Sequence, residues 1–190
     1  RTFTNITVDG TITHNTNYNT PVYKIDLTST GDLAVNFGGQ INIDSRGYYP
    51  GEGPGAGVDA DYGASGGGHG GNGGNGQSGN VGGTAYGSFT QPTDLGSGGG
   101  LRPYYWSSIY GGGAVKLTVS GTTTINGTIT ANGGYADVGN DRKPGGGAGG
   151  SIWITTGTLA GTGIVRANGG GSADSNYDGG GVVGGRVALY

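Results

Sequence analysis

The sequence predicts an all-β protein, namely a right-handed parallel β-helix (solenoid) with an added layer of polyglycine II-like segments. Glycine supplies 50 of the 190 residues, and much of it recurs at every third position. Short runs of Val, Ile, Leu and Thr follow glycine clusters, and equivalent runs lie about 36 residues apart, a period typical of solenoids and arrays. No long helix is expected, because Gly, Asn and β-branched residues dominate. The right-handed sense follows from the crossover rule for parallel strands.

The most regular glycine tract runs from Gly67 to Gly82, where a glycine occupies every third position. A period of three matches neither the α-helix nor the β-strand, but it is the repeat of an extended left-handed helix of the polyproline II type. One edge of such a helix carries no side chains, so another backbone can approach it closely. We expect the tract to lie beside the glycine clusters at 96–100, 111–113, 145–150, 169–171 and 179–185.

Two kinds of strand sequence are expected along the chain. The first kind comprises TVDGTIT at 7–13 and INID at 41–44, which resemble TINGTIT at 124–130 and ITAN at 129–132. The second kind follows glycine clusters and comprises AVKLTV at 114–119, SIWITT at 151–156 and RVALY at 186–190. After the first two of these come the related blocks GTITANGG at 127–134 and GIVRANGG at 163–170.

Alignment of these repeats predicts columns of equivalent residues. In a parallel β-helix such residues stack about 4.8 Å apart with one face turned inward. Asn and Asp tolerate the backbone of a corner, and stacked amides can bond along the stack. A β-sandwich with coincidental similarity is the alternative. The predicted columns are Ile12, Ile41, Ile129 and Val165; Val115, Ile152 and Val187; Leu117, Ile154 and Leu189; and Asn15, Asp44, Asn132 and Asn168.

The whole chain, residues 1–190, is expected to form a single glycine-rich β-solenoid. The spacing within the Asn and Asp column is uneven, since 88 residues separate Asp44 from Asn132. We therefore expect a long glycine-rich excursion at about 48–113 that leaves the stack and returns to it.

Composition excludes several classes of function. The net charge is −3 and only 11% of residues are charged, without the basic stripe that nucleic-acid binding needs. No apolar run is long enough for a membrane span. The chain has no Cys and no Met, so disulfides and Cys-based metal sites are excluded, and the lack of oxidisable sulfur favours an extracellular location. The absence of a starting Met indicates a processed chain or a fragment.

The order of the blocks carries a resemblance to a known class of modules. INIDSRGYYPGEGPGAG at 41–57 and ASGGGHGGNGG at 64–74 are followed by AYGSFTQPTDLGSGGG at 85–100 and by the two strand repeats. This succession resembles the glycine-rich β-helical modules of very large, secreted or surface-anchored microbial proteins, adhesin-like or filament-forming. The resemblance implies an extracellular structural or adhesive role and no catalytic residues. LRPYYWSSIY at 101–110 departs from the plain glycine run usual at that place.

Aromatic residues concentrate in this loop, and Tyr48 and Tyr49 are expected to join the same patch. Exposed aromatic rings anchor protein interfaces and stack on sugar rings. Three interpretations are open: a contact with a subunit or partner, a lid over the glycine layer, or a glycan-binding surface. The loop residues concerned are Tyr104, Tyr105, Trp106 and Tyr110.

Acidic residues recur after the ANGG blocks and form a candidate calcium site, because oxygen-rich turns hold Ca²⁺. They lack the alternation of a recognised calcium loop, and Asp also favours ordinary solvated turns, so both interpretations are open. His14 and His69 lack a second His at the spacing of a zinc site. The candidate calcium ligands are Asp137, Asp141, Asp174 and Asp178.

An enzyme is not expected. Polysaccharide lyases and glycosidases need paired carboxylates, or a carboxylate-bound cation with a basic residue nearby. The nearest arrangement in this sequence is Asp59 and Asp61 with Arg46. Asn126 and Asn5 each begin a sequence that matches the N-glycosylation acceptor, and both are candidates for that modification.

The sequence therefore predicts an extracellular structural protein, a rigid β-solenoid that builds a cell-surface or filamentous assembly by self-association. Strand sequences occur near both termini, and open strand edges invite pairing with another copy. The first alternative is a carbohydrate-binding adhesin or tailspike-like module that uses the loop at 101–110. The second alternative is a polysaccharide lyase or glycosidase. No cofactor other than the possible calcium is expected.

Overall fold

The computed structural model describes residues 1–17, 23–77, 79–101, 109–135, 144–171, 179–181 and 183–190. These residues form eleven strands and no helix, as the sequence predicted for an all-β protein. The strands are β1 (Thr2–Phe3), β2 (Ile6–Val8), β3 (Thr11–Ile12), β4 (Ile25–Ser29), β5 (Leu33–Val35), β6 (Gln40–Asn42), β7 (Ala114–Ile125), β8 (Thr128–Thr130), β9 (Ser151–Ala160), β10 (Ile164–Arg166) and β11 (Arg186–Leu189).

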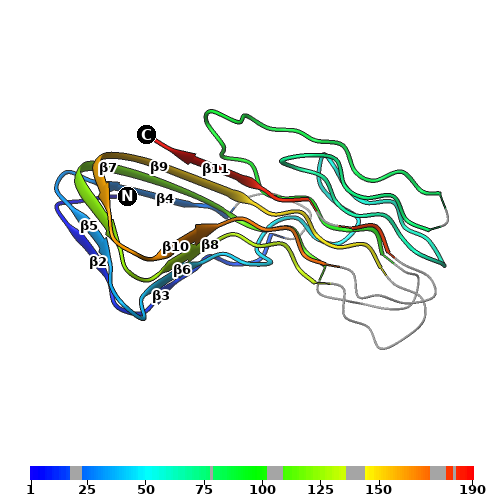
Figure 1. Cartoon of the computed structure of the whole chain (residues 1–190), viewed down its shortest axis with the longest axis horizontal. Helices are drawn as coiled ribbons and strands as arrows, with labels where there is room; N and C mark the ends of the chain where they lie inside the picture. The colour runs from blue at the N-terminus through cyan, green and yellow to red at the C-terminus, as the bar shows by residue number, and fades with distance from the viewer. Residues whose placement is uncertain (18–22, 78, 102–108, 136–143, 172–178, 182) are drawn as a thin grey trace.

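The strands form two sheets in which every recorded pair is parallel. In the larger, seven-stranded sheet, β1-β4-β7-β5-β2 are paired in that order, β9 pairs with β7, and β11 pairs with β9. The second sheet has the order β10-β8-β6-β3. Strands that follow one another in the chain thus define layers, namely β1–β3, β4–β6, β7–β8, β9–β10 and β11. Each layer pairs with the next one in chain order (Figure 1).

The register of these pairs confirms the three predicted apolar columns. Ile12 pairs with Ile41, Ile41 with Ile129, and Ile129 with Val165. The other two columns extend further than the sequence predicted, because β4 adds Ile25 and Leu27 to them. In those columns Ile25, Val115, Ile152 and Val187 align, as do Leu27, Leu117, Ile154 and Leu189.

The core lies between the two sheets and consists of aliphatic side chains from alternate strand positions. Leu117, Ile129 and Ile154 are completely buried, whereas the residues on either side of Leu117 and Ile154 are partly exposed. In β9 the burial follows this alternation as far as Ile154 and is lost over the last four residues, 157–160. The first four layers therefore share one continuous core, which is least covered at β9 and β10.

The glycine segments extend from the strands on the side opposite β2 and β5 (Figure 1). Residues 145–150 donate main-chain hydrogen bonds to three different segments in turn, and the sequence of partners repeats after three residues. Such a repeat is expected for an extended helix with three residues per turn. The bonds run from Gly145 to Gly100 and Ala148 to Ser97, from Gly146 to Gly180 and Gly149 to Val183, and from Gly147 to Gly134 and Gly150 to Ala131, with N···O distances of 2.7–3.3 Å.

The tract from Gly67 to Gly82 is not one continuous extended segment, contrary to the simplest interpretation of its period. It folds back on itself, since Gly66 donates to the carbonyl of Gly74 and Gly73 donates to that of Gly83. Gly79 has a φ of 78° at the second reversal, where glycine is favoured. The amide oxygen of Asn75 accepts the N–H of Gly82 at 3.0 Å across the same reversal. The tract lies beside other glycine clusters as predicted, because Gly67 donates to Gly146 and Gly74 to Gly181.

Candidate functional site

The structure brings together part of the predicted aromatic patch. The rings of Tyr49 and Tyr110 meet edge to face, with centroids 5.4 Å apart. Tyr48 is partly buried, and this burial, assisted by the Asp94 carboxylate, raises the pKa of its phenol. Tyr104, Tyr105 and Trp106 lie outside the described residues, so the choice between interface, lid and glycan-binding surface stays open.

The predicted acidic sites are not assembled by the part of the chain that is described. Asp137, Asp141, Asp174 and Asp178 lie outside it, and among the described residues no three His, Asp or Glu side chains are grouped to hold a metal ion. The Asp59 carboxylate instead accepts the N–H of Leu101 at 2.6 Å. Arg46 donates to the hydroxyl of Thr16 at 2.9 Å. Through these hydrogen bonds Asp59 and Arg46 each hold a loop in place.

Both candidate glycosylation residues have exposed side chains. Asn126 lies in the turn between β7 and β8, and its amide oxygen accepts the N–H of Thr162 at 3.4 Å. The amide oxygen of Asn5 accepts the N–H of Asp32 at 2.8 Å. Each side chain thus ties its turn to the next layer, and glycosylation stays a prediction for both.

Three members of the predicted Asn and Asp column form a hydrogen-bonded ladder where the second sheet ends. The Asp44 carboxylate accepts the main-chain N–H of Asn132 at 2.6 Å and its side-chain amide at 3.1 Å. The amide oxygen of Asn132 then accepts the N–H of Asn168 at 2.8 Å. The ladder joins three successive layers, so we interpret its three residues as stabilising the corner of each layer.

A buried polar cluster that the sequence did not reveal lies among the glycine segments. We call it the His69 cluster, and it consists of His69, Tyr86, Ser97 and Arg186. His69 is fully buried, and its ring lies against that of Tyr86 with centroids 4.9 Å apart. The Ser97 hydroxyl donates to the Tyr86 hydroxyl at 2.9 Å, which in turn donates to the carbonyl of Leu95.

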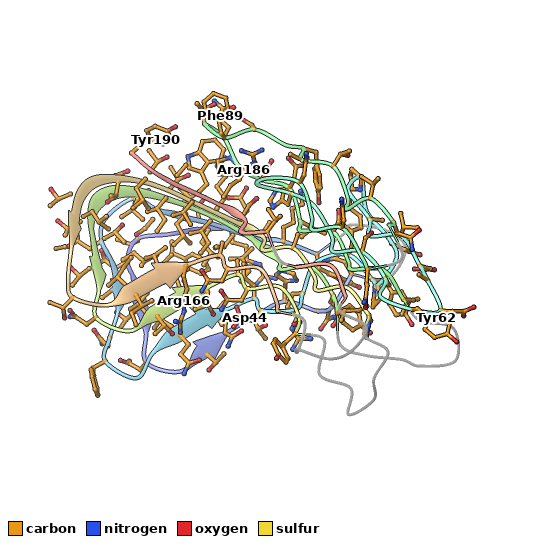
Figure 2. The ribbon with its side chains drawn as sticks, turned by 45° about the vertical axis from the view of Figure 1, so that its right-hand side comes forward. Asp44, Tyr62, Phe89, Arg166, Arg186 and Tyr190 are labelled. Atoms are coloured by element: carbon orange, nitrogen blue, oxygen red, sulfur yellow. The ribbon has the colours of Figure 1, made fainter. Side chains whose placement is uncertain are left out.

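Arg186 connects this cluster to β11. Its guanidinium donates to the main-chain carbonyl of Tyr86 at 3.0 and 3.2 Å and to that of His69 at 3.4 Å. We call the long segment between β6 and β7, which contains no strand in the described chain, the excursion. Figure 2 shows Arg186 on β11 beside it. Because these partners are main-chain carbonyls, the side chain fastens the excursion to the last strand whatever the identity of the residues at those positions.

Burial controls the protonation of the cluster. It lowers the pKa of His69, and the Arg186 guanidinium adds to this effect, while the hydrogen bond to the Gly149 carbonyl opposes it. The Nδ1 atom of His69 lies 2.8 Å from that carbonyl oxygen, so a neutral ring carries its proton there. Its buried Nε2 has no hydrogen-bond partner. Burial also raises the pKa of Tyr86, so the phenol stays protonated.

A neutral imidazole and a protonated phenol can accept and donate hydrogen bonds here, and the Ser97 hydroxyl of the cluster bonds to the Tyr86 hydroxyl and not to the His69 ring. We interpret the cluster as a fastening between the excursion and the sheet. Sequence reasoning considered His69 only as a zinc ligand and missed this role. No short motif could have indicated this role. Tyr86, Ser97 and Arg186 are distant from His69 in the sequence, and only the fold brings the four residues together.

We expect the protein to lose stability as the pH falls from about 7.5 to about 5.5. The pKa values of His69 and His14 are both lowered, mainly by burial, from an ordinary value of 6.5. The unfolded chain therefore takes up protons below about pH 6.5 that the folded chain refuses. Thermal unfolding across this range would measure the loss. His69→Asn, which keeps a donor for the Gly149 carbonyl, is expected to reduce the slope, and an unchanged slope would contradict the assignment.

Comparisons with known proteins assign no family to this chain. No protein-family model, curated protein or solved structure matches the chain significantly. In the described part of the chain, no helix has the length and apolar character needed to cross a membrane.

Proposed function

We propose that this chain is an extracellular structural module, a stiff building block of a cell-surface or filamentous assembly. The observation that carries the proposal is the way the described chain is held together. Parallel strands are stacked layer on layer, and bare glycine segments are bonded to each other through their main chains. Such contacts favour rigidity of the described part of the chain without a disulfide, which a chain lacking Cys cannot form.

We further propose that the layers are the coils of a right-handed parallel β-helix and that the glycine segments form a polyglycine II-type bundle beside it. The matching columns across four layers support the first statement, and the three-residue repeat of hydrogen-bond partners supports the second. An experimental structure of the protein would test both, and antiparallel or unstacked layers would overturn the β-helix.

Close main-chain contact explains why the glycine content is so high. At Gly111 an added Cβ would lie 1.7 Å from the carbonyl oxygen of Gly96, and at Gly150 it would lie 1.8 Å from that of Gly113. Any larger residue would force these segments apart. Glycine loses more conformational freedom on folding than other residues, so this composition is useful where dense packing of backbones matters more than side-chain chemistry.

We expect the folded protein to resist proteolysis and to keep its melting temperature when excess EDTA and a thiol reductant are added. The physical reason is that the described layers are joined by main-chain hydrogen bonds and packed aliphatic side chains, and that the chain has no Cys for a thiol to reduce. Thermal unfolding with and without EDTA, followed by addition of Ca²⁺, would measure this. A clear loss of stability on chelation that Ca²⁺ restores would instead favour calcium at Asp137, Asp141, Asp174 and Asp178.

The location is tested separately. Antibodies against the purified chain are expected to label the surface of intact producing cells or filaments attached to them, as seen by immunogold electron microscopy. Labelling confined to the cell interior would overturn the proposed function.

A further inference from the structure

The stack of layers is incomplete at the β9–β10 end. β11 pairs with Ser151–Ile154 of β9, and Tyr190 continues this pairing as far as Thr156. No strand of the described chain covers the rest of the outer edge of β9 or that of β10. The consequence is visible at Leu159, which is 45% exposed, whereas Leu33 and Thr123 in the same column are at most 1% exposed. A hollow of about 240 Å³ adjoins Leu159, Leu189 and Tyr190.

The opposite end of the stack is incomplete in the complementary columns. β1, β2 and β3 pair with the later part of the second layer, beginning at Thr28. In the described chain no strand covers the outer edge of Ile25, Asp26 or Leu27, although the terminal amine of Arg1 donates to the Asp26 carbonyl at 2.9 Å. A hollow of about 140 Å³ adjoins Ile25 and Asp26.

The residue columns show that each end carries the part of a layer that the other end lacks. Residues 186–189 occupy the columns of Ser151–Ile154. At the first layer only the last of these columns is covered, by Arg1, whose main chain bonds to Asp26 and Thr28 on either side of Leu27. Residues 2–12 occupy the columns that continue from Thr155 to Val165. At the last layer of the described chain only the first of these columns is covered, by Tyr190, whose main chain bonds to Ile154 and Thr156. The links are Thr2–Thr28–Thr118–Thr155, Ile6–Leu33–Thr123–Leu159, Thr7–Ala34–Thr124–Ala160 and Ile12–Ile41–Ile129–Val165.

We propose that a second copy of this chain covers the open end, so that β11 of one copy and β1–β3 of the next together form one complete layer. This inference rests on the proposed structural function and specifies its contact. In the joint layer, Ile6 of the second copy lies on Leu159 of the first, and Ile12 lies on Val165. In return, Val187 and Leu189 of the first copy lie beside Ile25 and Leu27 of the second.

The chemistry of the two ends suits this arrangement. Leu159, Val187 and Leu189 belong to inward-facing columns but are 43–45% exposed, so covering them removes apolar surface from water. The free strand edges gain main-chain partners at the same time. The two ends overlap in two columns. Arg1 bonds beside Leu27, where Leu189 of the other copy would lie, and Tyr190 bonds beside Thr155, where Thr2 of the other copy would lie. In each of these columns one of the two competing terminal residues must turn outward in the assembly.

The absence of Cys allows a direct test by site-specific crosslinking. Thr7 and Ala160 are exposed and share a column, so neighbouring copies would bring their Cα atoms within about 5 Å, inside the range for a disulfide. We expect a mixture of Thr7→Cys and Ala160→Cys proteins to form a heterodimer on mild oxidation. The double variant is expected to form a ladder of multimers. Thr7→Cys mixed with Phe37→Cys is the control for random collision, since Phe37 is 94% exposed but lies in the second layer.

A second measurement addresses the interface without a new covalent bond. Leu159→Glu is expected to weaken self-association on the order of tenfold or more in sedimentation experiments, because it places a charge in the covered column. The matched change Phe37→Glu is expected to leave association unchanged. Melting at low protein concentration confirms that both variants fold.

The outcomes separate this inference from the function on which it rests. Crosslinking of the Thr7 and Ala160 pair at the level of the Phe37 control, in a folded protein at high concentration, would overturn end-to-end stacking. It would leave the open edges to another segment or another protein, while surface labelling and resistance to EDTA still supported a structural module. Multimers that persist in Leu159→Glu would likewise overturn this contact and place the self-association elsewhere.

Discussion

Gly185→Ala is expected to lower the free energy of unfolding by about 3 kcal/mol or more, which is the upper range for overpacking. An added Cβ at Gly185 would lie 1.9 Å from the carbonyl oxygen of Gly150, and the next nearest atoms are also main-chain atoms of residues 149 and 150. No flexible side chain can move aside to relieve the clash. Two glycine segments must therefore separate, and the bond from the Gly185 N–H to the Ala167 carbonyl, 2.6 Å long, would be disturbed.

The neighbouring residue provides a matched control. At Gly184 the nearest atom to an added Cβ is the carbonyl oxygen of Ala167, 3.6 Å away, which is an ordinary contact. Gly184→Ala also reduces the freedom of the unfolded chain, so a change between zero and a gain of about 1 kcal/mol is expected. Urea unfolding of both variants at low protein concentration measures the difference. Equal losses in the two would mean that glycine is used here for flexibility and not for close packing of backbones.

The apolar columns could be predicted from the sequence because each is carried by side chains that repeat in register. Ile129 and Val165 lie 36 residues apart in recognisably similar blocks, and the structure pairs them. β4 was missed for the opposite reason. Its sequence, IDLTS, follows no glycine cluster and lies far from β7 in the chain, because the long excursion separates the two layers.

The folding of the glycine tract could not be read from its period alone. Every third residue is glycine on both sides of each reversal, so the pattern does not indicate where the chain turns. The amide side chains mark the second reversal, since Asn75 accepts the N–H of Gly82 and Asn72 accepts that of Ala85, both across the turn at Gly79. Asn and Asp favour such turns through bonds of this kind, and the Asn residues within the tract were the available signal.

The His69 cluster marks a different limit of sequence reasoning. Its hydrogen bonds go mostly to main-chain carbonyls, such as those of Gly149, Leu95 and Tyr86, and a carbonyl has no signature in a sequence. A single His in a glycine tract therefore looks the same whether it is exposed or buried. Only the packing of the excursion on β11 decides that His69 is buried and neutral.

The register of the second sheet predicts a large loss of stability when Ile129 is truncated. Ile129 is fully buried between Ile41 and Val165 of the adjacent layers, so truncating it leaves a cavity that the layers on either side cannot fill. We expect Ile129→Ala to lower the free energy of unfolding by about 2–5 kcal/mol. The melting temperature is expected to fall by roughly 2–4 °C for each kcal/mol lost in a protein of this size.

Ile164→Ala is the matched control, because it makes the same chemical change in the strand that pairs with β8. Ile164 is 47% exposed and shares an outward-facing column with Thr128, so a loss below about 1 kcal/mol is expected. Urea unfolding of both variants at low concentration separates the two cases, since an unchanged slope with urea shows that only stability has changed. Similar losses at the two positions would contradict the register, because a slip by one residue exchanges the inward and outward faces of a strand. That result would remove the basis for stacking the layers, whereas a large loss at Ile129 alone ties the stability of the protein to the column that links four layers.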